Sequence, residues 1–211
     1  MTNIFDRDCR ACPRLAEFLD TVKKKYPDYY CRPVPSFGDQ EARLLIVGLA
    51  PGMHGANASG RPFTGDHAGI LLYETLHEFG FATHPQSDSA SDDLKLINCR
   101  ITNAVKCLPP DNKPVGAEIN TCNHFLANEI DAMPANSLVF ALGGIAHRAV
   151  VKAIGGRQAD YKFTHAAEHN VENFFTMLDS YHCSRYNTNT RRLTADMFRA
   201  VFARARAILD S

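Results

Sequence analysis

The chain has 211 residues, of which 45% are hydrophobic and 22% charged, so it is long and apolar enough to bury the core of a single domain over residues 1–211. Its 23 basic and 23 acidic residues cancel, which excludes binding to a polyanion through overall charge and leaves only a local basic patch. The sequence contains neither the roughly 18 consecutive apolar residues of a membrane span nor a start typical of a secretory signal. We therefore expect a cytoplasmic protein that does not bind membranes.

Hydrophobic spacing along the chain predicts helices and strands in alternation. In chain order, we expect a helix beginning near Cys12, a strand at 43–47, a helix at 68–79, a strand at 96–102, a helix at 118–133, a strand at 138–142, a helix from 144 through 154, a strand at 174–178 and a helix at 197–209. The proline-containing segment 26–40 and the polar segment 86–93 are expected to be loops. Strands that alternate with helices in this way form a parallel sheet with helices on both faces.

A loop rich in glycine follows the first expected strand, at 48–66. Loops at the carboxyl ends of parallel strands commonly bind ligands, and glycine allows the backbone to approach them closely. An ordinary glycine-rich turn is the alternative, but this segment also carries Arg61, Phe63 and Asp66. Polar residues follow the second and fourth strands, so we expect the ends of strands one, two and four to meet at one edge of the sheet.

Four of the seven cysteines are candidates for a metal site. Cys9 and Cys12 form a Cys-x-x-Cys motif at the expected start of a helix, and fourteen residues separate Cys107 from Cys122. Four thiolates bind zinc or a [4Fe–4S] cluster, and this spacing does not distinguish the two. A pair of buried thiols is the alternative for the motif. The remaining cysteines are expected to lie in the core or to line the site: Cys31, Cys99 and Cys183.

Four segments, in this order along the chain, resemble the motifs of the family-5, or type B, uracil-DNA glycosylases. They are the Cys-x-x-Cys motif at 9–12, GLAPGMHGANASGRPFTGD at 48–66, ITNAVKCLPPDNKP at 101–114 and HCSRYNTNTRRLT at 182–194. The resemblance implies a three-layer α/β/α fold with a central four-stranded parallel sheet, and a [4Fe–4S] cluster whose ligands are Cys9, Cys12, Cys107 and Cys122. It also implies removal of uracil and other deaminated bases, such as hypoxanthine and xanthine, from DNA in base excision repair. Where relatives have His-Pro-Ser, this chain has Cys183 in place of proline, which predicts a less rigid loop.

The chemistry of base excision fits the residues of these motifs. We expect Phe63 to stack on the extruded base, Asn103 to pair with the O4 and N3–H edge of uracil, and His182 to donate to O2 of the leaving base. We expect Asp66 to orient water or stabilise the sugar cation. Structural roles are the alternatives, as a core aromatic for Phe63 and as caps for Asn103 and Asp66. The expected base-binding residues are Gly48, Ala50, Gly52, Phe63, Asn103 and His182, and the expected catalytic residues are Asp66 and His182.

Several residues near the last motif are expected to bind DNA, because they would place positive charge and polar groups where phosphates must pass. They are Arg61, Ser184, Arg185, Tyr186, Asn187, Arg191 and Arg192. A solvated surface role is the alternative for each arginine. We expect the protein to be a monomer. We also expect it to leave the DNA strand intact, since neither the glycine-rich loop nor the last motif contains the lysine that a strand-nicking glycosylase needs.

Other classes of protein stay open as alternatives. One is a family-4-type uracil-DNA glycosylase restricted to uracil, and another is a non-catalytic nucleic-acid-binding protein that contains zinc or an iron–sulfur cluster. A hydrolase of free nucleotides usually needs several carboxylates around a divalent metal, which these loops lack. The sequence also contains no GxxxxGK[ST] motif.

Overall fold

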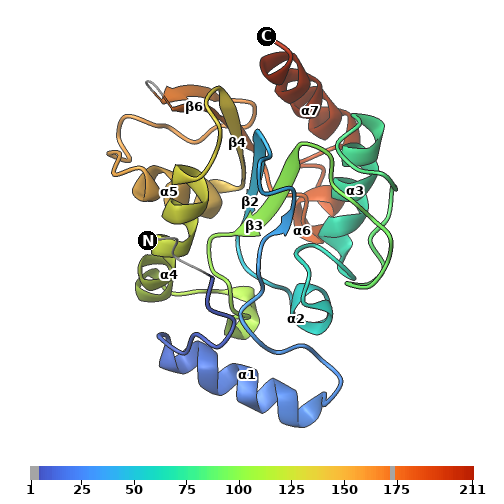
Figure 1. Ribbon diagram of the computed structural model, residues 1–211, viewed down its shortest axis with the longest axis vertical. Helices are drawn as coiled ribbons and strands as arrows, with labels where there is room; N and C mark the ends of the chain where they lie inside the picture. The colour runs from blue at the N-terminus through green and yellow to red at the C-terminus, as the bar shows by residue number, and fades with distance from the viewer. Residues whose placement is uncertain (1–4, 172–173) are drawn as a thin grey trace.

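The computed structural model describes residues 5–171 and 174–211, which form one six-stranded sheet with helices on both faces (Figure 1). The strand order is β1-β3-β2-β4-β6-β5. The strands are β1 (Phe37–Gly38), β2 (Leu44–Gly48), β3 (Cys99–Asn103), β4 (Ser137–Leu142), β5 (Glu168–Val171) and β6 (Phe175–Ser180). The four predicted strands correspond to β2, β3, β4 and β6, which pair in parallel. The prediction of a parallel sheet is therefore confirmed for its centre.

The predicted number of strands is too small, because a short antiparallel strand extends each edge of the sheet. β1 pairs with β3, and β5 pairs with β6. β1 has two residues, too few for an alternating pattern, and it lies in the proline-containing segment predicted to be a loop. β5 has the sequence Glu-His-Asn-Val, which contains no apolar run that would predict a strand. Both strands depend on pairing with a neighbour more than on their own residues.

The helices form two layers around the sheet. Their bounds are α1 (Pro13–Lys25), α2 (Ala56–Ser59), α3 (His67–Glu78), α4 (Gly116–Asp131), α5 (Gly144–Ala153), α6 (Arg185–Asn189) and α7 (Ala195–Leu209), with a 3₁₀ turn, η1, at Pro110–Asn112. Ile46 of β2 belongs to the buried cluster built with α3 and α7, and its neighbour Leu45 belongs to the cluster built with α4 and α5. Successive strand residues point to opposite faces, so these clusters lie on the two sides of the sheet (Figure 1). The predicted three-layer α/β/α architecture is confirmed.

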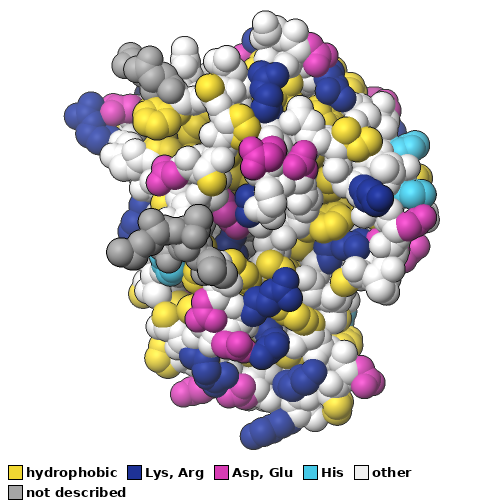
Figure 2. Space-filling model, in the orientation of Figure 1, with side chains coloured by type: hydrophobic (Ala, Val, Ile, Leu, Met, Phe, Trp, Pro, Cys, Tyr) yellow, Lys and Arg dark blue, Asp and Glu magenta, His cyan; other side chains and the backbone are white. Residues whose placement is uncertain are grey.

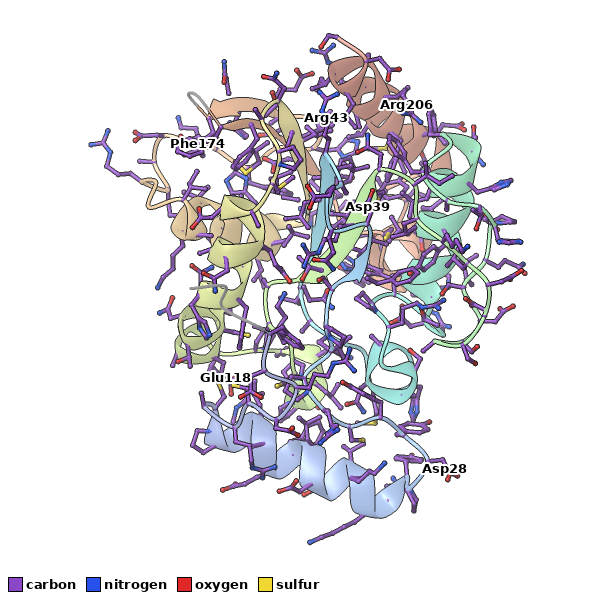
Figure 3. The ribbon with its side chains drawn as sticks, viewed as in Figure 1. Asp28, Asp39, Arg43, Glu118, Phe174 and Arg206 are labelled. Atoms are coloured by element: carbon purple, nitrogen blue, oxygen red, sulfur yellow. The ribbon has the colours of Figure 1, made fainter. Side chains whose placement is uncertain are left out.

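Helix α1 lies below the sheet in the view of Figure 1, outside the three layers. Leu19 and Val22 on its apolar face share a buried cluster with Leu108, which follows β3. Arg14 forms a bidentate ion pair with Glu118 in the first turn of α4: its Nε atom donates to Oε1 at 2.7 Å and its Nη2 atom to Oε2 at 2.8 Å. Figure 3 shows Glu118 beside α1. Contacts with residues far along the chain therefore hold this helix in place.

The face shown in Figure 2 carries Lys and Arg side chains interspersed with Asp and Glu side chains, as a net charge of zero suggests. None of the helices within 5–171 and 174–211 combines the length and the hydropathy needed to cross a bilayer. DNA binding on such a surface depends on a few well-placed cations.

Candidate active site

A cavity of about 530 Å³ lies at the carboxyl edge of the parallel strands. Strand register brings the ends together there, since Gly48 of β2 pairs with Asn103 of β3 and Leu142 of β4 pairs with Ser180 of β6. Six residues predicted to bind the base or act on it line the cavity: Ala50, Gly52, Phe63, Asp66, Asn103 and His182. The predicted meeting of the ends of strands one, two and four is confirmed.

Phe63 has an unusual backbone conformation at the cavity wall. Its φ angle is +56°, in the left-handed region where a non-glycine residue costs about 1–3 kcal/mol. Two glycines permit this position, because a Cβ atom on Gly48 would lie 2.7 Å from the Phe63 ring and one on Gly69 would lie 1.8 Å from its carbonyl oxygen. The Phe63 ring centre is 6.0 Å from that of His182. Phe63 is 6% exposed and packs in the buried cluster of α3 and α7 while it lines the cavity, so it combines a core role with a place in the cavity wall.

Gly48 itself was predicted to contact the base, and this prediction requires a correction. Gly48 is buried behind the Phe63 ring and does not line the cavity. Its lack of a side chain makes room for Phe63 and Asn103, so its effect on the base is indirect.

Asn103 lines the cavity, and its buried amide oxygen beside Gly48 is unsatisfied. The residue is 3% exposed, and its Oδ1 atom has no hydrogen-bond partner within the described residues. A buried polar atom left without a partner costs about 1–3 kcal/mol. A ligand that donates a hydrogen bond to this oxygen would remove that cost. The geometry therefore favours a ligand contact over a turn cap.

The Asp66 carboxylate lies between the N-termini of α2 and α3. Asp66 is the N-cap residue of α3; its side chain makes no capping hydrogen bond of ordinary geometry, although the backbone N–H groups of Gly69, Ala56 and Ala68 face the carboxyl and partly offset the effect of burial on its pKa. The carboxylate lies over Gly55, where a Cβ atom would be only 2.2 Å from Asp66 Oδ2. Burial raises the pKa of the Asp66 carboxyl above its ordinary value. A half-buried carboxylate with a raised pKa in a cavity is typical of a functional residue.

His182 reaches the cavity from the loop after β6. Burial lowers the pKa of its imidazole to about 4, so the ring is neutral at pH 7 and carries one N–H. Its ring nitrogens make no hydrogen bond to any residue that the structure describes, so they are free for a ligand. The His182 carbonyl accepts a hydrogen bond of 2.8 Å from Asn187 Nδ2. This bond fixes the backbone at His182.

Cys183, where relatives have proline, does not leave the loop loose. Its side chain is fully buried, and its Sγ atom donates to the carbonyl of Ala68 at 3.4 Å. Ser184 caps α6 by accepting a hydrogen bond from Asn187 N. Packing and capping thus replace the restriction that proline would impose. Cys31 and Cys99 are also buried, as predicted.

Four of the residues predicted to bind DNA line the rim of the cavity: Ser184, Arg185, Asn187 and Arg192. The Arg192 guanidinium lies 4.6 Å from the centre of the Tyr181 ring, a cation–π contact that fixes its position. Tyr186 is 72% exposed, and Arg191 is also exposed, but neither lines the cavity. For these two residues, DNA contact stays a prediction.

Arg61 was predicted to bind DNA, and the structure contradicts this. The residue is 6% exposed, and its guanidinium donates to Asp92, Ser87 and the carbonyl of Ala90 in the loop after α3. It also lies 4.3 Å from the centre of the Phe37 ring. A guanidinium enclosed by these partners cannot reach a phosphate. Arg61 organises the polar segment 86–93 instead.

We expect Arg61→Ala to lower the free energy of unfolding by about 3–5 kcal/mol, because removing one partner of a buried ion pair leaves the other charge uncompensated. The salt dependence of DNA binding should stay unchanged. Urea unfolding and binding titrations measure the two effects. Arg10→Ala is the control, since Arg10 pairs with Asp20 on the exposed side of α1 and should have little effect on stability. If Arg61→Ala is stable and its DNA affinity depends less on salt concentration, Arg61 binds DNA after all.

Other cavity residues were not identified from the sequence. Gly143 and Gly144 follow β4, and the rule used for the other strand ends would have found them. Phe163 lies in the loop between α5 and β5, where no pattern points to it. Its ring lies 5.6 Å from that of His147 and 6.1 Å from that of Tyr181. Only the folded chain brings this residue to the cavity.

A buried hydrogen-bonded group holds the Phe163 segment. His147 contacts Asp179 Oδ1 through Nδ1 at 2.8 Å and the Tyr161 carbonyl through Nε2 at 2.9 Å. His169 contacts the other Asp179 oxygen at 3.1 Å. Although burial lowers the pKa of His147, the hydrogen bond to Asp179 raises it overall. The group connects α5, β5 and β6 beneath the cavity.

The four predicted metal ligands line one small pocket between α1, the segment after β3 and α4: Cys9, Cys12, Cys107 and Cys122. Burial and the neighbouring cysteines raise the pKa of Cys107 to about 12. Within the described ranges, the sole set of three His, Cys, Asp or Glu ligand atoms all within 4.8 Å of one another is that of His147, His169 and Asp179. The four sulfur atoms therefore share a pocket but are spread more widely than a tight tetrahedral set.

Lys106 lies near the site in sequence but not in space. It is 1% exposed, and its Nζ atom contacts both carboxylate oxygens of Glu129, at 2.9 and 3.0 Å, and Thr102 Oγ1. Among the described residues, no lysine lines the cavity. Lys106 therefore does not supply the cavity with the amine that a strand-nicking mechanism requires.

Comparison with known proteins gives a consistent result. The family described as "Uracil DNA glycosylase superfamily" matches residues 35–206. The type-5 uracil-DNA glycosylase of Thermus thermophilus is 43% identical over 205 residues, covering 95% of this chain and 93% of its own. That of Pyrobaculum aerophilum is 40% identical over 204 residues, covering 95% of this chain and 88% of its own.

A solved structure supports the fold. The crystal structure of Pedobacter heparinus SMUG2 superimposes with a TM-score of 0.50 at 16% sequence identity, covering 92% of this chain and 85% of that one. At this identity the likeness concerns the fold alone. The sequence matches span nearly the whole chain and include the segments that build the cavity. The chain belongs to the type-5 uracil-DNA glycosylases of the uracil DNA glycosylase superfamily, whose members hydrolyse N-glycosyl bonds.

Proposed function

We propose that this protein excises uracil from DNA, together with the deaminated purines hypoxanthine and xanthine, as a monofunctional glycosylase of base excision repair. The observation that carries the proposal is the buried Asn103 side chain, which lines the cavity with Phe63 and His182 and whose amide oxygen has no partner among the described residues. An amide both accepts and donates, so it matches the N3–H and O4 edge of uracil. The relatives that match nearly the whole chain carry the name uracil-DNA glycosylase.

The cavity fits an extruded base rather than a base within a duplex. Reaching the N-glycosyl bond requires the nucleotide to rotate out of the stack. Phe63 then offers a ring face for stacking, and Asn103 holds the edge of the base. A volume of about 530 Å³ lies in the range of cavities that bind small molecules.

Bond cleavage follows from the charges that develop. The C1′–N bond breaks with its electron pair passing to the base, so the base becomes an anion and the sugar a cation. His182 donates its N–H to O2 of the base, and the Asp66 carboxylate stabilises the cation and orients the attacking water. Water adds to C1′ and passes its proton to the Asp66 carboxylate, and the released base anion takes up a proton from solvent. Preorganised groups of this kind act on the transition state more than on the ground state.

Labelled oligonucleotides containing uracil, hypoxanthine or xanthine test the proposal. We expect base release from each, and strand breakage only after alkali converts the abasic site. Asn103→Ala should reduce discrimination between bases more than it reduces the maximal rate. Breakage without alkali would contradict the monofunctional mechanism, and no base release from any substrate would contradict the proposal as a whole.

We also propose that Cys9, Cys12, Cys107 and Cys122 hold a [4Fe–4S] cluster. Four thiols in one pocket suit such a cluster. A single zinc ion would hold its thiolates about 3.8 Å apart, given Zn–S bonds of about 2.3 Å. The described sulfurs include no set of three within 4.8 Å of one another, and the resemblance of the cysteine motifs to those of the family-5 glycosylases implies the larger cluster. The cluster would connect the start of α1 to the segment after β3 and to α4.

Freshly purified protein is expected to be brown, with about four irons and four sulfides per chain. Cys107→Ala should lose the colour and most of the iron, and should lower the melting temperature because a link between α1 and the rest of the fold is removed. Cys31→Ala is the control, since Cys31 is buried outside this pocket and should keep its iron. Stoichiometric zinc in a colourless protein would exclude the cluster while preserving the ligand assignment.

Weak, salt-dependent binding to undamaged DNA is expected from a neutral protein with a local cationic rim. Arg191→Ala combined with Arg192→Ala should reduce the slope of log affinity against log salt by about one to two units. The control pairs Arg199→Ala with Arg204→Ala, which removes the same charge from α7, where both arginines already pair with acidic residues. Equal slopes in the two double variants would place the DNA-binding face elsewhere.

A further inference from the structure

A second hollow, of about 460 Å³, adjoins the base cavity. Both are lined by Phe63, Asp66, His67 and Arg185, so these residues form the boundary between them. We refer to the second hollow as the side groove. The side groove and the base cavity are therefore neighbours that share a wall.

The outer wall of the side groove comes from the loop after α3. Gln86, Ser87 and Asp88 line it, and Ile70 of α3, which is 57% exposed, adds an apolar surface. The Asp88 side chain is exposed and makes no hydrogen bond or ion pair within the described residues. Its carboxylate is therefore free to accept hydrogen bonds from a ligand.

Buried contacts fix the shape of this wall. The Asp92 carboxylate accepts from the backbone N–H groups of Asp88, Ser89 and Leu94 at 3.0, 3.1 and 3.2 Å, and it pairs with the buried Arg61. Ser87 is held by Thr64 at 2.7 Å and by Arg61 at 3.1 Å. A polar segment that would otherwise be solvated is thus held rigidly beside the active site.

The covalent connection between nucleotides identifies the group that occupies the side groove. A nucleotide whose base fills the cavity is joined to its neighbours by single phosphates, so a neighbour must leave at the rim of the cavity. The charged side chains of the side groove determine which part of the neighbouring nucleotide binds there. Asp88 would repel a phosphate, whereas Arg185 at the boundary attracts one. The apolar surface of Ile70 and the carboxylate of Asp88 instead suit a neutral heterocycle.

We infer that the side groove binds the base next to the flipped nucleotide and that Asp88 is a specificity-determining residue for it. The inference rests on the proposed function. A carboxylate accepts hydrogen bonds and donates none, so it favours a base with an exocyclic amino group, such as cytosine N4. Thymine carries the O4 carbonyl at the corresponding position, which the carboxylate repels. Cytosine beside uracil is therefore preferred over thymine.

The test uses single-stranded oligonucleotides that differ only in having cytosine or thymine on the 5′ or the 3′ side of a uracil. We expect single-turnover release of uracil to be about fivefold faster with cytosine than with thymine on one side, the effect of one hydrogen bond at a partly exposed site. Asp88→Asn should bring this ratio close to one, because an amide also donates to the O4 of thymine.

Asp93→Asn is the matched control. It removes the same charge from the same loop, but the Asp93 side chain is 89% exposed and lies outside the side groove. The cytosine-to-thymine ratio should stay at its original value in this variant. Because each ratio is measured within one protein, a general loss of activity cancels.

Three outcomes contradict the inference: a ratio near one on both sides in the unaltered protein, an unchanged ratio in Asp88→Asn, or the same change in Asp93→Asn. If uracil is released at equal rates in every context, only the side groove assignment fails. If no oligonucleotide loses uracil, the proposed function fails first.

Discussion

Asp66→Asn is expected to slow single-turnover release of uracil by about 10²–10³-fold while making the protein more stable at neutral pH. The rate effect is that of removing one preorganised electrostatic contact to the transition state. The stability effect follows from burial, which raises the pKa of the Asp66 carboxyl in the folded state. Stability from this group is fully present below the unfolded pKa and is lost as pH rises through the folded pKa. A neutral amide removes that loss.

Asparagine also separates the catalytic role from a structural one. It is as good an N-cap as aspartate, so a residue that only caps α3 would tolerate the change with little loss of rate. Quenched single-turnover assays and melting temperatures at pH 7 provide the two readouts. Asp196→Asn, in the exposed first turn of α7, is the control and should change neither. A near-unchanged rate in Asp66→Asn would make Asp66 a helix cap.

His182→Ala should reduce the rate by a similar factor of about 10²–10³, because it removes the donor to the leaving base. Since burial lowers the pKa of His182 to about 4, the neutral ring is the active form. The rate of the unaltered protein should therefore stay level from pH 6 to pH 8. A rate that falls above pH 6.5 would indicate a charged imidazole acting as a general acid. His182→Gln keeps an N–H donor and should recover part of the loss.

The same residue makes stability depend on pH in a predictable direction. The unfolded chain binds a proton at His182 near its ordinary pKa of 6.5, whereas the folded protein resists it until the pH approaches about 4. Stability is therefore lost as the pH falls through this interval. The melting temperature of His182→Ala should fall less than that of the unaltered protein between pH 7 and pH 5.

Much of the active site was predictable because it depends on topology. Four apolar runs with helical segments between them specify parallel strands, and the carboxyl ends of parallel strands share one edge. Asn103 and His182 follow two of those runs, so their meeting with the glycine-rich loop needed no knowledge of side-chain packing. The grouping of the Cys-x-x-Cys motif with its two distant partners in one pocket was likewise predictable, and the cluster that they would hold is a proposal.

The remaining features depend on contacts that local sequence does not encode. An arginine in a glycine-rich loop suggests a phosphate contact, but Arg61 finds its partner thirty-one residues later, in Asp92. Phe163 lies in a loop without a repeating pattern, and its place in the cavity follows from the packing of α5 against the sheet. β1 and β5 have too few apolar residues to be identified from their own sequence, because only pairing with a neighbouring strand defines them.

The position of α1 has a consequence for how the chain is made. This helix is synthesised before the residues that hold it, because Leu108 and Glu118 emerge from the ribosome about a hundred residues later. At about 5–20 residues per second, the gap lasts roughly 5 to 20 seconds. During that time the apolar face of α1 and the thiols of Cys9 and Cys12 lack their final partners. The nascent chain thus passes through an interval in which α1 is open to chaperones and to oxidants, and translation of the segment after β3 brings that interval to an end.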